Sequence, residues 1–152
     1  MNVAKFRKQI NINSKVIVEG KEYKIKQLVK FRLADGDWYM RLFFTDGNVL
    51  ADDLGENIFI LVKKIETDFE LPFPKKLVYQ NKEFKFSYDA RAVAEEVFGE
   101  GVFRVGDSEK FWDYEAEDGS YLSLGIDDKT GKRMDLVGKI VKQVDVTVIN
   151  QI

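Results

Sequence analysis

Cysteine and histidine are both missing from this chain of 152 residues. Without them there is no thiolate nucleophile, no Ser-His-Asp triad, and no zinc or haem site built from the usual ligands. An excess of positive charge is also absent, because 24 Lys and Arg are balanced by 26 Asp and Glu. A surface with this balance does not attract phosphate backbones. We therefore expect a protein that is not an enzyme, has no metal or cofactor, and does not bind nucleic acid.

Long apolar runs are absent as well. The longest, Ile58-Phe-Ile-Leu-Val62, has the length of a strand and is far too short to span a membrane. The first ten residues lead into Asn11 and Asn13 without the apolar stretch of a signal peptide. Together with the absence of cysteine, this predicts a soluble, cytoplasmic protein with no transmembrane segment.

An internal repeat organises the chain. Residues 16–25 (VIVEGKEYKI) align without a gap with residues 77–86 (LVYQNKEFKF), and two later matches follow in the same order. The offset between the copies grows from 61 to 72 residues, which indicates an insertion within Ser87–Lys110. We predict a single β domain, 1–152, with an internal repeat, 16–65 and 77–140, and a connector, 67–74, that holds both prolines. The alternative is that short β-hairpins resemble one another by chance.

Turn residues mark two hairpins in each copy. Gly20 and Asn81 occupy equivalent positions, and both residue types tolerate the positive φ of a tight type I′ turn. Asp46-Gly47 and Asp118-Gly119 are typical two-residue hairpin turns. Each copy is therefore predicted to be antiparallel β.

The Asp46-Gly47 turn also predicts a register, which places Leu42 opposite Ala51. Alternation along the strand then separates two faces. The face with Met40, Leu42 and Phe44 is predicted to belong to the core.

The opposite face of the same strand is the candidate binding surface. It holds Tyr39, Arg41 and Phe43, where the second copy has Asp113 and Glu115. Aromatic residues and arginine carry much of the binding energy of protein interfaces, so these three residues are predicted to form a partner surface. The alternative is that the N-terminal segment or the other copy covers this face.

One segment is ambiguous. Residues 89–98 have Asp89 as a candidate N-cap, alanine-rich spacing, and Gly99 where a helix would stop. An irregular loop or a strand would fit the same residues. By contrast, residues 144–149 alternate as a strand.

Carboxylates at alternate positions, Asp113, Glu115 and Glu117, resemble the start of a calcium loop. The glycine comes one residue late, and Leu124 stands where a bidentate glutamate is needed. We interpret these acids as a solvated strand edge and predict no metal site.

Acidic pairs and tryptophans were considered for other roles. Asp52-Asp53 would need a cleft and unequal pKa values to act as an acid–base pair, so loop solubility is the preferred interpretation. Trp38 and Trp112 lie in core-type strands, and packing is preferred to a stacking role for them.

Several of these segments resemble one known family. Lys82-Glu-Phe-Lys-Phe86, the run from Trp112 to Ser123, Met134-Asp-Leu-Val-Gly138 and Gly20-Lys-Glu-Tyr23 are similar to the bacterial domain-of-unknown-function family 4178. The resemblance implies a compact β domain without an established activity, often found near membrane-stress proteins of the phage-shock type. It supplies no catalytic residue to carry over. Gly125 stands where the resemblance leads us to expect an acidic residue.

The predicted fold is all-β, or β-rich with at most one short helix. Its two antiparallel halves are expected to pack as a sandwich or as fused small barrels. The predicted function is that of a non-enzymatic protein-interaction or accessory domain, linked to membrane-stress systems, whose partner is another protein. The alternatives are a toxin-immunity-type inhibitor and a carbohydrate- or small-ligand-binding module, which would need an open pocket.

Overall fold

A computed structural model describes residues 1–150 of the chain, and strands dominate them. In chain order the elements are α1 (Val3–Gln9), β1 (Lys15–Val18), β2 (Lys21–Leu33), β3 (Trp38–Phe44), β4 (Asn48–Asp53), β5 (Ile58–Ile65), β6 (Lys76–Tyr79), β7 (Lys82–Gly99), β8 (Ser108–Glu115), β9 (Ser120–Asp127), β10 (Arg133–Lys142), a 3₁₀ turn (Gln143–Asp145) and β11 (Val146–Ile149). No helix in the described part of the chain has the length and apolar character needed to cross a membrane.

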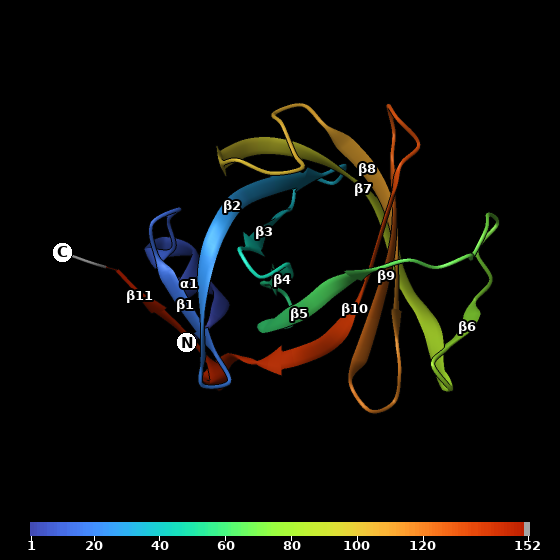
Figure 1. Cartoon of the computed structure of the whole chain (residues 1–152), viewed down its shortest axis with the longest axis horizontal. Coiled ribbons are helices and arrows are strands. Elements are labelled where there is room, and N and C mark those ends of the chain that lie inside the picture. Colours follow the sequence, from blue (N-terminus) through green and yellow to red (C-terminus); the bar gives the residue numbers. More distant parts are fainter. Residues whose placement is uncertain (151–152) are drawn as a thin grey trace.

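Eight of the strands close into one antiparallel barrel. The order around it is β2-β3-β4-β5-β10-β9-β8-β7, and β7 pairs back onto β2. Closure gives every strand of the ring two partners and leaves no open edge in it. Figure 1 looks into this barrel. The all-β prediction is confirmed, and the two halves share one barrel in place of a sandwich or two fused barrels.

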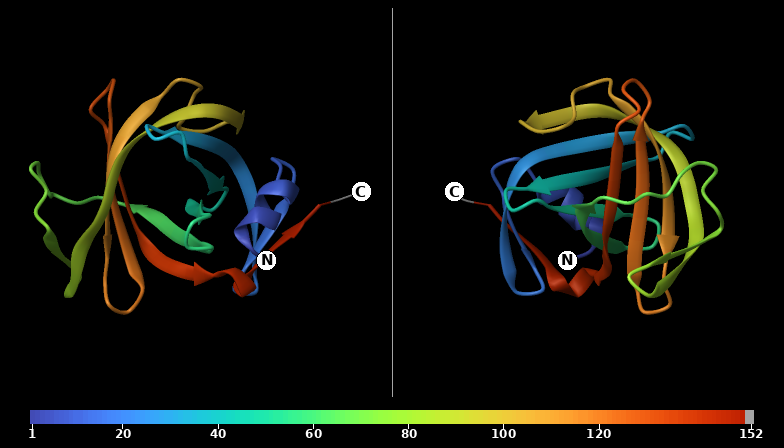
Figure 2. Two further views of the ribbon diagram at one scale, coloured as in Figure 1. Left: turned by 180° about the vertical axis from the view of Figure 1, so that it is seen from behind. Right: turned by 45° about the vertical axis from the view of Figure 1, so that its right-hand side comes forward.

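The two halves have the same strand order. β2 to β5 and β7 to β10 each supply four barrel strands, and the halves meet where β5 pairs with β10 and β2 with β7. The hairpins that precede them turn at Gly20 and Asn81, with φ of 81° and 62°. β1 and β6 lie on opposite sides of the barrel (Figure 2). Superposition of 16–65 on 77–140 remains the test of the predicted duplication.

The register predicted at Asp46-Gly47 is wrong by one residue. Leu42 pairs with Leu50, not with Ala51. The N–H of Gly47 donates to the carbonyl of Phe44 at 3.1 Å, and Gly47 has a φ of 91°. The loop thus has three residues and ends on a glycine bulge. The Asp118-Gly119 turn has the same geometry, with Gly119 N–H donating to the carbonyl of Ala116.

Residues 89–98 form a strand, so the helix considered for them is wrong. They belong to β7, which runs for 18 residues, pairing with β8 and then with β2. This pairing on both sides satisfies the backbone, and Ala92 and Ala94 are buried in the barrel. The single α-helix of the described residues is instead α1, whose Asn2 side chain accepts from the N–H of Lys5.

The residues predicted as core are buried, but outside the barrel wall. Met40, Leu42 and Phe44 point outward from β3 into a cluster with Phe6 of α1 and Val146 of β11. The helix and the outer strands thus cover one side of the barrel. A second outer cluster lies under β6 and the 67–74 connector and contains Leu77, Phe84, Tyr114, Leu122 and Leu124.

Candidate functional site

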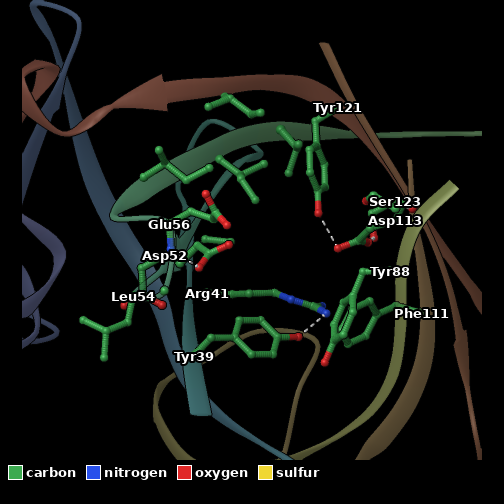
Figure 3. A pocket seen from close by; sticks show the side chains of 18 of the residues that line it. Tyr39, Arg41, Asp52, Leu54, Glu56, Tyr88, Phe111, Asp113, Tyr121 and Ser123 are labelled. Atoms are coloured by element: carbon green, nitrogen blue, oxygen red, sulfur yellow. Dashed lines mark hydrogen bonds between the residues drawn. The ribbon is translucent and has the colours of Figure 1, made fainter. Parts of the chain in front are cut away.

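A cavity of about 940 Å³ extends from the interior of the barrel to its rim, where Arg7, Trp38 and Asp52 also line it. Its exposed lining residues, which mark the mouth, include Asp37 of the β2–β3 turn, Leu54 and Glu56 of the β4–β5 turn, and Tyr88 of β7. Figure 3 shows Leu54 and Glu56 on one side of the space and Tyr88 across from them. The interior is therefore reachable from one end of the barrel.

The other end is closed by the β7–β8 loop. Phe103 of this loop is buried, and its ring meets Phe31 at 5.0 Å and Phe43 at 5.5 Å between centroids. The side chain of Gln27 donates to the carbonyl of Phe103 at 2.8 Å and accepts from its N–H at 3.2 Å. These two hydrogen bonds satisfy buried polar groups of both residues and fix the β7–β8 loop at this end of the barrel.

The floor of the cavity contains a buried ion pair. Arg41 on β3 donates to Glu109 on β8, and also to the hydroxyl of Tyr39 at 2.7 Å. Burial disfavours the charged guanidinium, but the carboxylate of Glu109 and the hydroxyl of Tyr39 together outweigh this and raise the pKa of Arg41. A Cβ on Gly125 would lie 3.3 Å from Glu109 Oε2, so glycine leaves room for that carboxylate.

Asp113 is the second acidic group inside the barrel. Its Oδ1 accepts from the hydroxyl of Ser123 at 2.6 Å, and its Oδ2 accepts from the hydroxyl of Tyr121. Burial raises the pKa of this carboxyl to about 6, against the opposing effects of the two hydroxyls and of Arg41. Figure 3 shows Asp113 and Tyr121 directed toward one another at the cavity wall. Asp113 thus has hydroxyl donors, and no salt bridge to it is found within residues 1–150.

Aromatic and aliphatic side chains form the rest of the wall. The ring of Phe111 lies 6.1 Å from Tyr39 and 6.0 Å from Tyr88. The opposite wall is aliphatic and comes from β4, β5 and β10. Its members are Val49, Ala51, Ile58, Ile60, Val62, Leu136 and Ile140.

Negative charge predominates around the cavity. Of the charged residues that line it, only two are basic, Arg7 and Arg41, and each is bound to a carboxylate, Asp52 and Glu109 respectively. The other acidic lining residues are Asp37, Asp53, Glu56, Asp113 and Glu115. The described lining therefore has a negative potential with no free cation to offset it.

The structure places the predicted partner surface inside the barrel, which contradicts that prediction. The side chain of Arg41 is only 7% exposed, and Tyr39 and Phe43 are half-buried beside it. The second half of the chain covers them, through Phe103 and Glu109. Coverage by the other copy was the alternative that the alternation left open.

Asp52 corrects another prediction. The sequence predicts a solvated loop residue at this position. Asp52 is instead buried, and its carboxylate accepts hydrogen bonds from Nε and Nη2 of Arg7, at 2.7 and 3.1 Å. The N–H of Met40 donates to it as well, at 2.9 Å. Asp52 therefore anchors α1 to the barrel.

Trp38 lies at the rim of the cavity, whereas Trp112 does not line it. The Arg7 guanidinium stacks 4.0 Å from the Trp38 ring, and Trp112 packs edge-on against Phe73 at 4.9 Å. The residues that sequence reasoning missed as a site are Asp113 and Tyr121. Alternation does place Asp113 on the same inner face as its strand neighbour Glu115, but a one-residue error in register hides that Tyr121 lies beside them.

No group of three or more carboxylates within residues 1–150 is arranged to hold a metal ion. Asp113 is engaged by two hydroxyls, and Glu117 lies outside β8 in the turn that follows it.

Fold and site together define a class: an eight-stranded antiparallel barrel, closed at one end, with a ligand-sized cavity. The family model of a domain of unknown function, DUF4178, matches residues 11–141. The chain belongs to this family. No curated protein and no solved structure matches the chain.

Proposed function

We propose that this domain binds a small molecule inside its barrel. The observation that carries the proposal is the cavity of about 940 Å³ with one open end. Small-molecule sites in proteins are concave, mostly apolar and roughly 300 to 1,000 Å³, with a few polar groups that orient the ligand. Eight-stranded barrels are just wide enough to hold one small ligand.

The polar groups of the cavity are few and well fixed. Arg41 and Glu109 hold one another at the floor, and Tyr121 and Ser123 orient Asp113 on the wall. Such fixed groups lower the entropic cost of binding because they need little rearrangement. The proposed activity is binding without catalysis, in line with the absence of histidine and cysteine nucleophiles and bases.

A neutral fluorescent probe, N-phenyl-1-naphthylamine, tests the proposal. We expect its emission to rise in the presence of the protein and to do so saturably. Ala51→Trp and, separately, Ile60→Trp should suppress binding, because these two paired residues of β4 and β5 line the cavity. The control is Thr45→Trp in the exposed β3–β4 turn, outside the cavity. Equal binding by all variants would place the probe elsewhere and contradict the proposal.

A second candidate function is the protein interaction predicted from the sequence, at a different surface. Val93 of β7 and Val105 of the β7–β8 loop are 42% and 69% exposed and line a shallow hollow of about 590 Å³. Exposed apolar side chains gathered in one place are typical of interaction surfaces. We expect Val105→Asp to abolish capture of a partner in a pull-down while probe binding in the barrel is unchanged. Capture that survives this change would remove the hollow from consideration.

The expected location in the bacterial cytoplasm and the link to membrane-stress systems are part of the same proposal. Their support is the absence of cysteine from the chain and the resemblance of its sequence motifs. Fractionation of cells, with the protein detected by an antibody, is the direct test.

A further inference from the structure

Asp113 has unused capacity to bind a donor. An ionised carboxylate offers about four lone-pair positions, and Asp113 uses two of them for the hydroxyls of Tyr121 and Ser123. Both partners are neutral. The nearest guanidinium, Arg41, is held by Glu109. A carboxylate on a half-buried wall is costly without a countercharge, so a cationic ligand would remove a cost that the free protein bears.

Aromatic rings lie around the same carboxylate. Phe111 and Tyr88 pack at 6.0 Å from one another, and Figure 3 shows both on the side of the cavity that carries Asp113. Tyr121 is a third aromatic residue beside Asp113, because its hydroxyl donates a hydrogen bond to that carboxylate. The faces of aromatic rings attract cations, and such cages are a general means of recognising alkylammonium groups.

The mouth of the cavity is negatively charged, like Asp113 inside it. Asp37, Asp53, Glu56 and Glu115 line it, and no cation bound to any of these four residues is found among residues 1–150. A cleft with one sign of charge and apolar walls focuses the electric field and raises the local concentration of ions of opposite sign. Anionic ligands would meet this field and find both arginines of the lining already paired.

Resting on the proposed ligand site, the geometry points to a ligand class: organic ammonium cations with an apolar or aromatic body, with Asp113 as their counter-ion. The ammonium donates to Asp113 and lies against the rings beside it. The body of the ligand packs on the aliphatic wall formed by β4, β5 and β10. The acidic mouth accelerates association and disfavours anions.

The ligand class is tested with three probes that share one naphthyl body. They are 2-(1-naphthyl)ethylamine, the neutral 2-(1-naphthyl)ethanol and the anionic 3-(1-naphthyl)propanoate, titrated calorimetrically at pH 7.5. We expect the amine to bind at least tenfold more tightly than the alcohol, and the carboxylate more weakly than either. Equal affinities for amine and alcohol would overturn the ligand class while leaving the barrel as a binding site. If none of the three probes binds the wild-type protein, and the titrations of Ala51→Trp look the same as those of the wild type, the proposed function is overturned as well.

Two variants locate the counter-ion. Asp113→Asn should abolish the preference for the amine over the alcohol while alcohol binding is retained. The matched control is Glu115→Gln, which removes one charge from the same strand, two residues nearer the mouth, where the side chain is exposed. It should lower the preference by less than threefold. Preference lost in Glu115→Gln and kept in Asp113→Asn would overturn the role of Asp113.

The pH dependence of wild-type binding gives an independent measurement. The amine needs the ionised carboxylate, so its affinity should fall as the pH is lowered through about 6, the pKa of Asp113 in the free protein. Affinity for the alcohol should be flat over the same range. A flat amine profile from pH 5 to 7.5 would contradict the assignment. The ionisable groups that face Asp113 are Arg41 and Tyr39 of β3, Tyr88 of β7, Glu109 of β8 and Tyr121 of β9.

Discussion

Asp52 is buried and Asp113 is half-buried, each in a strand of the barrel, and their partners differ. Asp52 on β4 accepts hydrogen bonds from Nε and Nη2 of Arg7 and from the N–H of Met40. Among residues 1–150, the carboxylate of Asp113 on β8 accepts hydrogen bonds only from the hydroxyls of Tyr121 and Ser123. Burial raises the pKa of both carboxyls.

The difference separates structure from binding. The countercharge of Asp52 is part of the chain, so this carboxylate fastens α1 over the outer face of β3 and β4. Asp113 faces a cavity and forms no salt bridge within residues 1–150, which leaves its charge available to a ligand. We therefore expect substitutions at the two sites to change stability in opposite directions.

The largest effect is expected where the built-in pair is broken. Arg7→Met leaves Asp52 buried without a cation, and removal of one partner of a buried pair costs about 3 to 5 kcal/mol. Urea denaturation at pH 7 measures the loss of unfolding free energy. The deficit should shrink as the pH falls, because protonation removes the uncompensated charge.

Arg91→Met is the control for Arg7→Met. It breaks the pair between Arg91 and Asp128, at 2.9 Å, in which the Arg91 side chain is 57% exposed and the Asp128 side chain 29%. Exposed pairs contribute less than about 1 kcal/mol. A similar loss in both variants would show that Asp52 is not special.

Asp113→Asn is expected to stabilise the free protein. The pKa of Asp113 is about 6 in the folded state and 3.8 when unperturbed, so the folded protein binds more protons between these values and loses stability as the pH rises through them. Such a shift corresponds to roughly 3 kcal/mol, and water in the cavity reduces it, so we expect a gain of about 1 to 2 kcal/mol at pH 7. Below pH 3.8 the gain should vanish. Urea denaturation at pH 7 and pH 3.5 checks both points, and destabilisation at pH 7 would contradict them.

The smallest effect concerns the turn that sets the register of β3 and β4. Gly47→Ala places a Cβ at a φ of 91°, and this left-handed backbone costs an L-residue about 1 kcal/mol. Gly55→Ala in the next turn is the control, because Gly55 has no positive φ and a Cβ there would be in ordinary contact with Asp53. Thermal melts should separate the two variants. Equal melting temperatures would mean that the glycine bulge is not required.

Much of the fold could be predicted from the sequence because its signals are local. Gly20 and Asn81 mark equivalent hairpin turns, and alternation along β3 separates Leu42 from Arg41 correctly. Residues 89–98 could not be assigned, because their strand is fixed by pairing with β2 and β8, which are distant in the chain. Alanine-rich spacing alone favours a helix there.

The site was harder to predict, for a geometric reason. Alternation places Tyr39 on one face of its strand with Arg41, and Asp113 on one face of its strand with Glu115. Only closure of the barrel decides whether each of these faces points inward or outward. Closure also brings Arg41 to Glu109, across 68 residues of sequence. The unexpected bulge at each Asp-Gly turn shifts Tyr121 into reach of Asp113. No local signal contains these facts.

The most direct test is the ionisation of Asp113 itself. Carbon-13 NMR of its side-chain carboxyl, assigned with Asp113→Asn, gives the pKa in the free protein and in the protein saturated with 2-(1-naphthyl)ethylamine. We expect a pKa of about 6 for Asp113 without the amine and a clear fall when the amine is bound, because a bound cation favours the ionised form. A pKa that is unchanged by saturating amine would contradict the assignment of Asp113 as the counter-ion.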